Sequence, residues 1–246
     1  MRHSTLKVNK VGNGIFSILG LISMWWALSL VVDKAYIVPA PPLVYASLVD
    51  LLKTPSFYRA VMNTLLRTFF CICLSLTGGV ILGLTAGTFE VVRGLLAPLV
   101  QIMRTLPTIV IIIYVIIWMS SGWAPIFVTL LIALPIIYAN VLEGYDQTST
   151  ELVEMARFYH FSRMKKLKLL YIPSVKPFIQ AGVVAITSLS LKVMIASEVL
   201  SQTQGSLGKA FQMAKINIQT ERVFALAVIT IFLSFGLERF VKKVTR

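Results

Sequence analysis

The chain has 246 residues, of which 57% are hydrophobic and 13% are charged, and its formal net charge is +13. Soluble domains contain about 45–50% apolar and about 25% charged residues, so the composition excludes an ordinary soluble protein and predicts an integral membrane protein. A basic excess in so apolar a chain is typical of loops on the inner side of a membrane, and no nucleic-acid partner is expected.

The N-terminal part predicts one membrane span followed by a loop. Residues 1–14 are polar and basic, and residues 16–32 carry no charge. This pattern resembles a signal peptide, but no small-residue cleavage site follows, so we expect a retained first span with its basic end inside. Residues 33–61 are predicted to form a loop. Prolines between positions 39 and 42 should extend the chain, and the amphipathic stretch after them should lie on the membrane surface.

The residues from Thr68 to Phe89 predict the second span, because they carry no charge over 22 positions. Gly79, Gly83 and Gly87 recur there at every fourth residue and form one stripe of small residues. Such stripes allow helices to approach closely in lipid, and we expect this one to pack within the subunit. Residues 90–93, which include two charges, should then form a short turn.

The remaining apolar segments predict four more spans. Residues 105–142 carry no charge over 38 positions, which is too long for one span and fits two. The turn between these two is expected at 118–125, where glycine, proline and two tryptophans occur. A fifth span is expected at 177–197 and a sixth at 223–237, joined by a polar connection. Because the inner segments then hold most of the basic residues, six spans with both termini in the cytoplasm are predicted.

The stretch from Glu143 to Pro177 is the only long run of mixed charge, and six of its residues are basic. It lies between membrane spans and must be in water, so we expect another protein to bind it. Residues 151–161 can form a short helix, with one of residues 148–150 as its N-cap. Pro173 should end the polar segment before the next span begins.

This stretch resembles the "EAA" signature of the membrane subunits of ABC importers. In that signature, Glu-Ala-Ala is followed by three residues, a glycine, nine residues and Ile-x-Leu-Pro. Here Glu154, Met155 and Ala156 are followed at the same spacing by His160 and by the segment 170–173. Met155 and His160 depart from the pattern. The resemblance to the sulfonate, taurine and nitrate branch continues in NTLLRTFF…GLTAGTFEVVRGLLAPLVQIMRTLPT, in IASEVLSQTQGSLGKAFQMAKINIQTERVFA and in PAPPLVYASLVDLL.

The resemblance implies an all-α, polytopic helical transmembrane protein with six spans and the MetI-like ABC permease fold. Residues 1–57 would form an N-terminal span and a proline-rich surface segment, and residues 58–246 the permease domain with its coupling loop at 143–177. The implied function is that of a permease subunit in an ATP-driven importer, which forms the pathway for a small solute of the sulfonate, taurine, nitrate or vitamin-precursor type. The rival hypothesis is a membrane-embedded enzyme or an assembly subunit without a transport role.

The resemblance also implies the partners. Two copies of an ATPase subunit would bind from the cytoplasm and hydrolyse ATP, so the chain itself is not expected to be an enzyme. A periplasmic or extracellular binding protein would deliver the solute, and a second permease copy would complete a homodimer in the bacterial inner membrane. No cofactor or metal is expected, and the sequence contains no P-loop for ATP.

Family members insert the helix of the coupling loop into a groove of the ATPase, so the same contact is expected here, with Glu154 and Ala156 near its centre. The residues expected at the contact are Glu151, Glu154, Met155, Ala156, Arg157, His160, Ser162 and Pro173. Glycine suits the tight turn in the family pattern, and His160 can adopt the same left-handed conformation at some cost.

Polar residues in or beside the spans are candidates for the solute pathway. These candidates are Thr105, Thr108, Ser188, Lys192 and Glu198. Lys192 lies 16 residues after Lys176, roughly 24 Å along a helix, which puts it in the outer half of the bilayer. It can face the pathway, reach the outer interface or pair with Glu198. The serine and threonine hydroxyls can instead bond within their own helices, and Arg67 and Arg104 are expected to reach water at span ends.

Overall fold

The computed structural model describes the backbone of residues 10–244, and the side chains from residue 16 onward except that of residue 18. This part of the chain contains helices, turns and connecting segments and no strand. The elements are α1 (Lys10–Val32), α2 (Pro41–Lys53), α3 (Pro55–Thr88), α4 (Glu90–Thr105), α5 (Thr108–Trp118), α6 (Ala124–Asp146), α7 (Thr150–Phe158), α8 (Arg163–Lys166), the π-helical turn η1 (Leu167–Tyr171), α9 (Ile172–Ser201), α10 (Leu207–Ile216) and α11 (Thr220–Val244).

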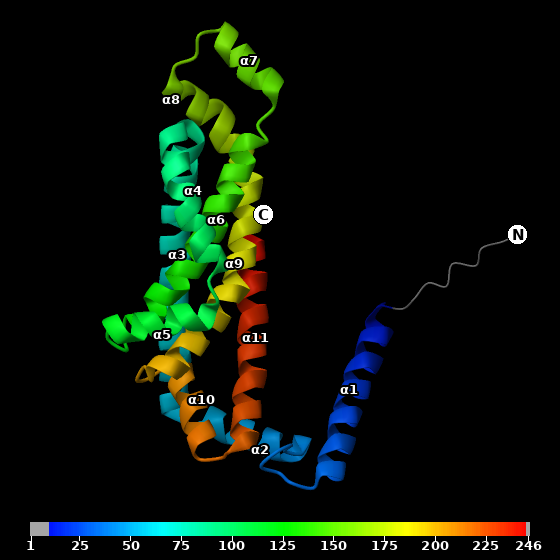
Figure 1. Cartoon of the computed structure of the whole chain (residues 1–246). Helices are drawn as coiled ribbons and strands as arrows, with labels where there is room; N and C mark the ends of the chain where they lie inside the picture. The colour runs from blue at the N-terminus through cyan, green and yellow to red at the C-terminus, as the bar shows by residue number, and fades with distance from the viewer. Residues whose placement is uncertain (1–9, 245–246) are drawn as a thin grey trace, which may run out of the picture.

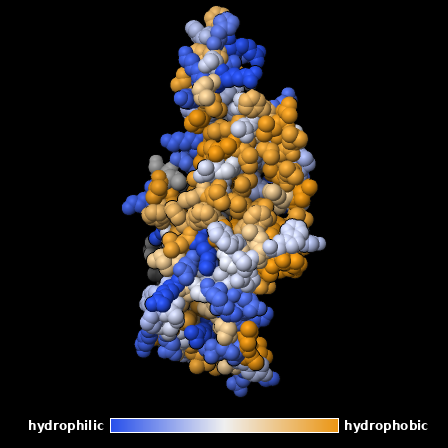
Figure 2. Space-filling model, turned by 90° about the vertical axis from the view of Figure 1, so that its left-hand side faces the viewer, coloured by the Kyte–Doolittle hydropathy of each residue, from blue (hydrophilic) through white to orange (hydrophobic). Residues whose placement is uncertain are grey.

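The long helices α3, α6, α9 and α11 form an elongated bundle, with α7 and α8 at one end and α2 and α10 at the other (Figure 1). We call these the α7 end and the α10 end. Figure 2 shows hydrophobic side chains over the middle of one face and hydrophilic ones concentrated above and below them. This distribution is the one expected for a bundle surrounded by lipid at its centre and by water at both ends.

Four helical segments of the described chain are long and apolar enough to cross a membrane. They are α3, α6, the continuous segment Arg163–Ser201 and α11. The pair α4 and α5 would make a fifth span, although the two helices are bent by 103° at their junction. The apolar part of α1, Leu19–Val32, is shorter than these segments. The fold is therefore all-α and polytopic, and the count of six spans stays a prediction.

The third span differs from the predicted one. It begins at Glu90 rather than Thr105, because residues 90–93 continue as helix and the chain reverses at Phe89 instead. It also breaks at Leu106, whose φ of −65° and ψ of 131° are extended. Pro107 causes this break, since proline disfavours the helical conformation of the residue before it. The predicted turn after this span is confirmed, because α5 ends at Trp118 and α6 begins at Ala124.

The glycine stripe packs α3 against α6, as predicted. A Cβ atom on Gly79 would lie 2.6 Å from Ile137, and one on Gly83 would lie 2.6 Å from Val141. Gly87 meets the ring of Tyr145 in the same way, at 2.5 Å. The two backbones are therefore as close as the absence of side chains allows. The buried core around this contact contains Ile72, Ala133, Ile137, Val141, Val175, Val183 and Ile186.

Two segments that were predicted as connections are partly helical. In the predicted loop 33–61, residues 41–53 form α2, which packs on α11, and α3 begins at Pro55. Pro41 and Pro42 open α2, because proline's fixed φ and missing N–H suit a first helical turn. The predicted boundary between residues 57 and 58 falls in the first turn of α3, and the two-part division stays a prediction. The polar connection before α11 contains α10.

Pro173 does not end the polar loop. It lies in the first turn of α9, and the helix runs without interruption from Arg163 to Ser201. The π-helical turn Leu167–Tyr171 directly precedes α9. It widens the helix at the point where the ring of Pro173 and its missing N–H would disturb the regular hydrogen bonds of an α-helix. Half of the predicted loop is thus an extension of the fifth span toward the α7 end.

Candidate functional site

Helix α7 is a short, well-capped helix at the tip of the long loop (Figure 1). The Ser149 hydroxyl accepts a hydrogen bond from the backbone N–H of Leu152 at 3.4 Å and so caps its first turn. Glu151 in the first turn and Arg157 in the last turn complement the helix dipole. The predicted capping region is therefore confirmed, whereas the helix ends at Phe158, three residues before its predicted end at residue 161.

The turn after α7 is a Schellman motif with histidine in the left-handed position. His160 has a φ of 51°. The N–H of Phe161 donates to the carbonyl of Ala156 at 2.9 Å, and the N–H of His160 donates to the carbonyl of Arg157 at 3.0 Å. These two bonds satisfy carbonyls that the end of the helix would leave unpaired. His160 thus occupies the left-handed position that glycine usually takes in this motif.

Ala156 is not available to a partner. The exposed fraction of Ala156 is 0%. The expectation that Ala156 lies at the centre of an intermolecular contact is therefore wrong for its side chain. The exposed apolar side chains of this segment are instead Leu152, Met155, Phe158 and Tyr159, and Phe158 is 79% exposed. Leu152, Met155 and Phe158 follow each other at three-residue spacing, so they share one helix face.

The remaining predicted contact residues differ in their positions. Glu151 is exposed. Glu154 and Arg157 are also exposed and line a hollow of about 360 Å³ between α7 and the rest of the loop. The Ser162 hydroxyl caps α8 by accepting from the N–H of Lys165 at 3.3 Å. Pro173 lies in the first turn of α9 and is separated from α7 along the chain by α8 and the π-helical turn.

Two contacts fasten the base of this loop to the bundle. The rings of Tyr145 on α6 and Tyr171 in the π-helical turn are stacked, with centroids 3.9 Å apart and planes within 9°. Arg93 on α4 forms a bidentate ion pair with Asp146 at the end of α6, at 3.0 and 2.7 Å. The helices that enter and leave the loop are thereby tied to each other and to the third span.

The five pathway candidates do not gather at one site. Thr105 and Thr108 are exposed at the bend between α4 and α5, and the Thr105 hydroxyl donates to carbonyls of its own helix. Ser188 and Lys192 lie on α9 and line a hollow against α11. Glu198 lies further along α9 and is fully buried. It lies neither at the bend between α4 and α5 nor in the hollow against α11.

The hollow between α9 and α11 has a volume of about 300 Å³. It is lined by Ser188, Lys192, Thr230, Ile231, Ser234, Phe235 and Glu238, and we call it the α9–α11 pocket. The Ser188 hydroxyl donates to Oε2 of Glu238 at 3.1 Å, and Nζ of Lys242 donates to Oε1 at 2.5 Å. Lys192 has no hydrogen-bonded or ion-paired partner in the described part of the chain. The pocket therefore holds two opposite charges, and Lys192 interacts electrostatically with Glu238 without a direct hydrogen bond or ion pair.

Glu198 is fully buried and serves a different purpose. It accepts hydrogen bonds from the hydroxyl of Thr64 at 2.8 Å, from Nη1 of Arg67 at 3.1 Å and from the N–H of Gly208 at 3.2 Å. Of the three alternatives for Lys192, pairing with Glu198 is therefore ruled out. Arg67 pairs with Glu198 instead, and its side chain remains 23% exposed. A buried carboxylate needs such partners, because an unpaired charge in a dry interior is very costly. The group ties α3, α9 and α10 together.

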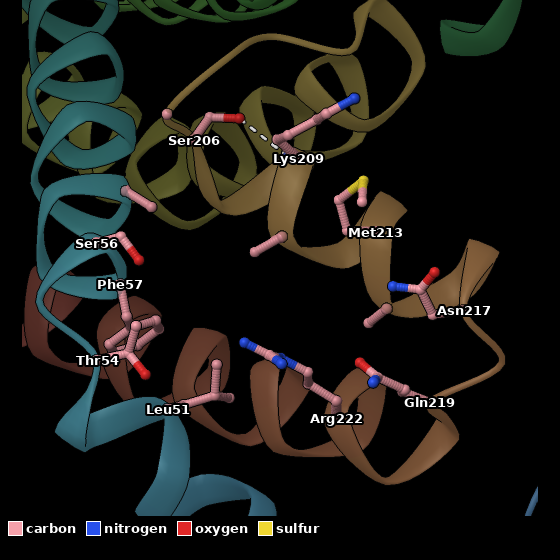
Figure 3. A pocket seen from close by; sticks show the side chains of 14 residues that line it. Leu51, Thr54, Ser56, Phe57, Ser206, Lys209, Met213, Asn217, Gln219 and Arg222 are labelled. Atoms are coloured by element: carbon pink, nitrogen blue, oxygen red, sulfur yellow. Dashed lines mark hydrogen bonds between the residues drawn. The ribbon is translucent and has the colours of Figure 1, made fainter.

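A further hollow opens at the α10 end (Figure 3). It has a volume of about 350 Å³ and lies between the α2–α3 corner, α10 and the first turn of α11. Figure 3 shows the Arg222 side chain reaching into it from α11, while the Lys209 ammonium points outward. No carboxylate lines this hollow, so its lining is cationic.

Comparison with known proteins identifies the family. Residues 79–246 match the family described as "Binding-protein-dependent transport system inner membrane component". The chain belongs to this family. This permease is 23% identical to the taurine transport system permease protein TauC of Escherichia coli (strain K12), over 92% of this chain and 86% of that protein. It is also 23% identical to the putative aliphatic sulfonates transport permease protein SsuC of Bacillus subtilis (strain 168), over 92% and 82%.

Two solved structures share the fold of this permease. A bacterial ABC transporter that imports the acidic polysaccharide alginate matches with a TM-score of 0.66 and 14% identity, over 97% of this chain and 99% of that one. The MetNI methionine ABC transporter in an inward-facing conformation matches with a TM-score of 0.55 and 18% identity, over 77% and 94%. The predicted MetI-like permease fold is confirmed, and the chain is a multi-pass membrane permease of an ABC importer.

Sequence reasoning missed two features of the permease's sites. The exposed apolar face of α7 is visible in the sequence as Leu152, Met155 and Phe158 at three-residue intervals, but the signature drew attention to Glu154 and Ala156 instead. Glu238 stands one residue beyond the predicted sixth span, among basic residues, and the sequence analysis did not single it out. Its position four residues before Lys242 was the available signal for a charged pair on one helix face.

Proposed function

We propose that this permease transmits the motion of a separate ATPase through the exposed apolar face of α7, and that ATP hydrolysis resides in that ATPase alone. The observation that carries the proposal is the combination of a rigid turn at His160 with three exposed apolar side chains on one face of α7. A contiguous exposed apolar face on a water-facing element is typical of a protein-binding surface. The stacked tyrosines and the Arg93–Asp146 pair would pass the movement of α7 to the spans.

The proposed assembly contains two identical permease copies, two ATPase copies and one binding protein. The α7 end would face the cytoplasm, together with both chain termini, and the α10 end would face the binding protein. The cationic hollow at the α10 end, with Arg222 pointing into it, is complementary to an acidic side chain of that protein. We propose such a carboxylate as its occupant.

The proposed solute is a small organic anion or zwitterion that carries a sulfonate or carboxylate group. Relatives of the permease are named for taurine, for aliphatic sulfonates and for glycine betaine, which share an acidic group on a short carbon chain. The ammonium of Lys192 in the α9–α11 pocket supports this class, because it forms no direct ion pair in the described residues and a cation within a span needs an anion, water or another helix beside it.

Reconstitution tests the proposed function. The permease, its ATPase and its binding protein would be placed in proteoliposomes, and uptake of labelled taurine would be measured with and without ATP. ATP-dependent uptake that requires the binding protein is the expected result. Uptake that proceeds equally without ATP or without the binding protein would contradict the proposal.

A further inference from the structure

We infer that the α9–α11 pocket binds the transported solute as a zwitterion, with an acidic group of the solute beside Lys192 and an ammonium group beside Glu238. This inference rests on the proposed transport function and narrows its substrate class. It follows from two opposite charges that line one small cavity on two different helices.

The pocket is an open hollow on the outside of the bundle, where Lys192, Ile231 and Phe235 are exposed. Lys192 stands nine residues before the end of α9, roughly 14 Å along the helix. Glu238 stands six residues before the end of α11, roughly 9 Å from that end. An ionisable side chain within a span, as Lys192 is, is costly in a membrane protein and can mark an ion or substrate pathway. Lys192 and Glu238 line a hollow of about 300 Å³, which has room for a small ligand of a few heavy atoms.

The Lys192 side of the pocket is suited to an anion. Its ammonium has three N–H donors and no hydrogen-bonded or ion-paired partner in the described residues. The Ser234 hydroxyl, which also lines the pocket, is likewise without a hydrogen bond among them. The other two hydroxyls are already donating, Thr230 to the carbonyl of Leu226 at 2.9 Å and Ser188 to Glu238 at 3.1 Å. Free donors are thus concentrated at Lys192 and Ser234.

The Glu238 side of the pocket is suited to a cation. A carboxylate has about four acceptor sites, and Ser188 and Lys242 occupy two of them. The Glu238 side chain remains 30% exposed, so acceptor capacity is left for a donor from the solute. A solute with a negative charge alone would be repelled by this carboxylate, whereas a solute with both charges satisfies both sides. Ile231 and Phe235 on the same wall can contact the short carbon chain between the two charged groups.

Two compounds that differ in one group test the inference. 2-Aminoethanesulfonate and 2-hydroxyethanesulfonate have the same length and the same sulfonate, but only the first carries an ammonium group. Their binding to the permease–ATPase complex in nanodiscs would be measured by saturation-transfer difference NMR, without a binding protein, so that the selectivity of that protein does not enter. We expect the aminosulfonate to bind at least tenfold more tightly than the hydroxysulfonate.

Three variants assign the two charges. Glu238→Gln should remove the preference for the aminosulfonate, and Lys192→Met should abolish binding of both compounds. Glu221→Gln makes the same change at another carboxylate of α11 that does not line the pocket, and it should leave the preference unchanged. Size-exclusion profiles and thermal unfolding of each variant establish that the complex is intact.

Several results would overturn the inference. Equal affinity of the wild-type complex for both compounds would show a site that recognises the anion alone. Unchanged binding in Lys192→Met, or no binding of either compound to the wild type, would remove the pocket as the site. ATP-driven uptake in proteoliposomes made from the same preparation tests the transport function separately, so its failure and the failure of the zwitterion site are distinguishable.

Discussion

His160 shows how one residue sets the direction of a whole segment. A left-handed conformation costs a residue with a side chain about 1–2 kcal/mol relative to glycine. Glycine in turn loses roughly 0.5–1 kcal/mol more backbone entropy on folding. The first effect is larger, so His160→Gly should stabilise the turn by up to about 1 kcal/mol, whereas the β-branched His160→Val should destabilise it.

Limited proteolysis at the loop measures this effect, because cleavage follows local opening. His160→Gly should slow cleavage after the basic residues of α8, and His160→Val should accelerate it. Faster cleavage of His160→Gly than of the wild type would show that the histidine side chain stabilises the turn in some other way.

Phe158 provides the sharpest residue-level test of the contact with the ATPase. Its side chain is 79% exposed, so replacement disturbs little within the permease. Burying such a side chain in a partner contributes about 1.5–3 kcal/mol, which corresponds to roughly a 10- to 100-fold change in affinity. Phe158→Asp should therefore reduce co-purification of the ATPase by at least tenfold while the thermal stability of the permease is unchanged.

Ala156→Asp is the contrasting variant. Ala156 is enclosed within its own loop, so the new carboxylate would be buried without a partner. This variant should lose ATPase binding together with loop stability, detected as faster proteolysis. If Phe158→Asp retained normal ATPase binding, α7 would not contact the ATPase through its apolar face.

At the scale of elements, the contact between α3 and α6 depends on the absence of side chains. A methyl group on Gly83 would overlap Val141 and approach the carbonyl of Tyr138 to 3.2 Å, so the two helices would have to separate. Overpacking of this kind typically costs 1–3 kcal/mol. Gly83→Ala should lower the midpoint of thermal unfolding in detergent. Gly94→Ala is the matched control, because nothing lies within 4 Å of its added methyl group. An equal effect at both positions would indicate that helix propensity matters here and close packing does not.

The elements also show which structural features the sequence could predict. The cap of α7 and the glycine stripe were predictable, because both depend on residues one to four positions apart along one helix. The break at Leu106 was also readable, since a residue before proline disfavours the helix. The burial of Ala156 was not, because it requires the chain to fold back at His160. The α9–α11 pocket was not either, because Ser188 and Glu238 are 50 residues apart and meet only when two helices pack.

At the scale of the whole molecule, the distribution of basic residues predicts the orientation in the membrane. Reporter fusions after Gly14 and after Arg246 should both report the cytoplasm, because the predicted inner segments carry most of the basic residues. Cross-linking of the purified complex should give two copies of the permease and two of the ATPase. A C-terminus outside the cell would place α7 on the wrong side for an ATPase and would overturn the coupling proposal with the topology.

The buried carboxylate of Glu198 has a consequence for how this protein can change over evolutionary time. Its partners come from α3 and α10, so positions 64, 67, 198 and 208 should be inherited as one unit. A lineage that loses Arg67 leaves a buried charge behind unless position 198 becomes neutral in the same lineage. Position 208 should be inherited together with position 198. A Cβ atom added at Gly208 would lie 2.2 Å from the Cβ atom of Glu198, so any side chain there would overlap it. Alignments of close homologues should therefore show these positions changing jointly or not at all.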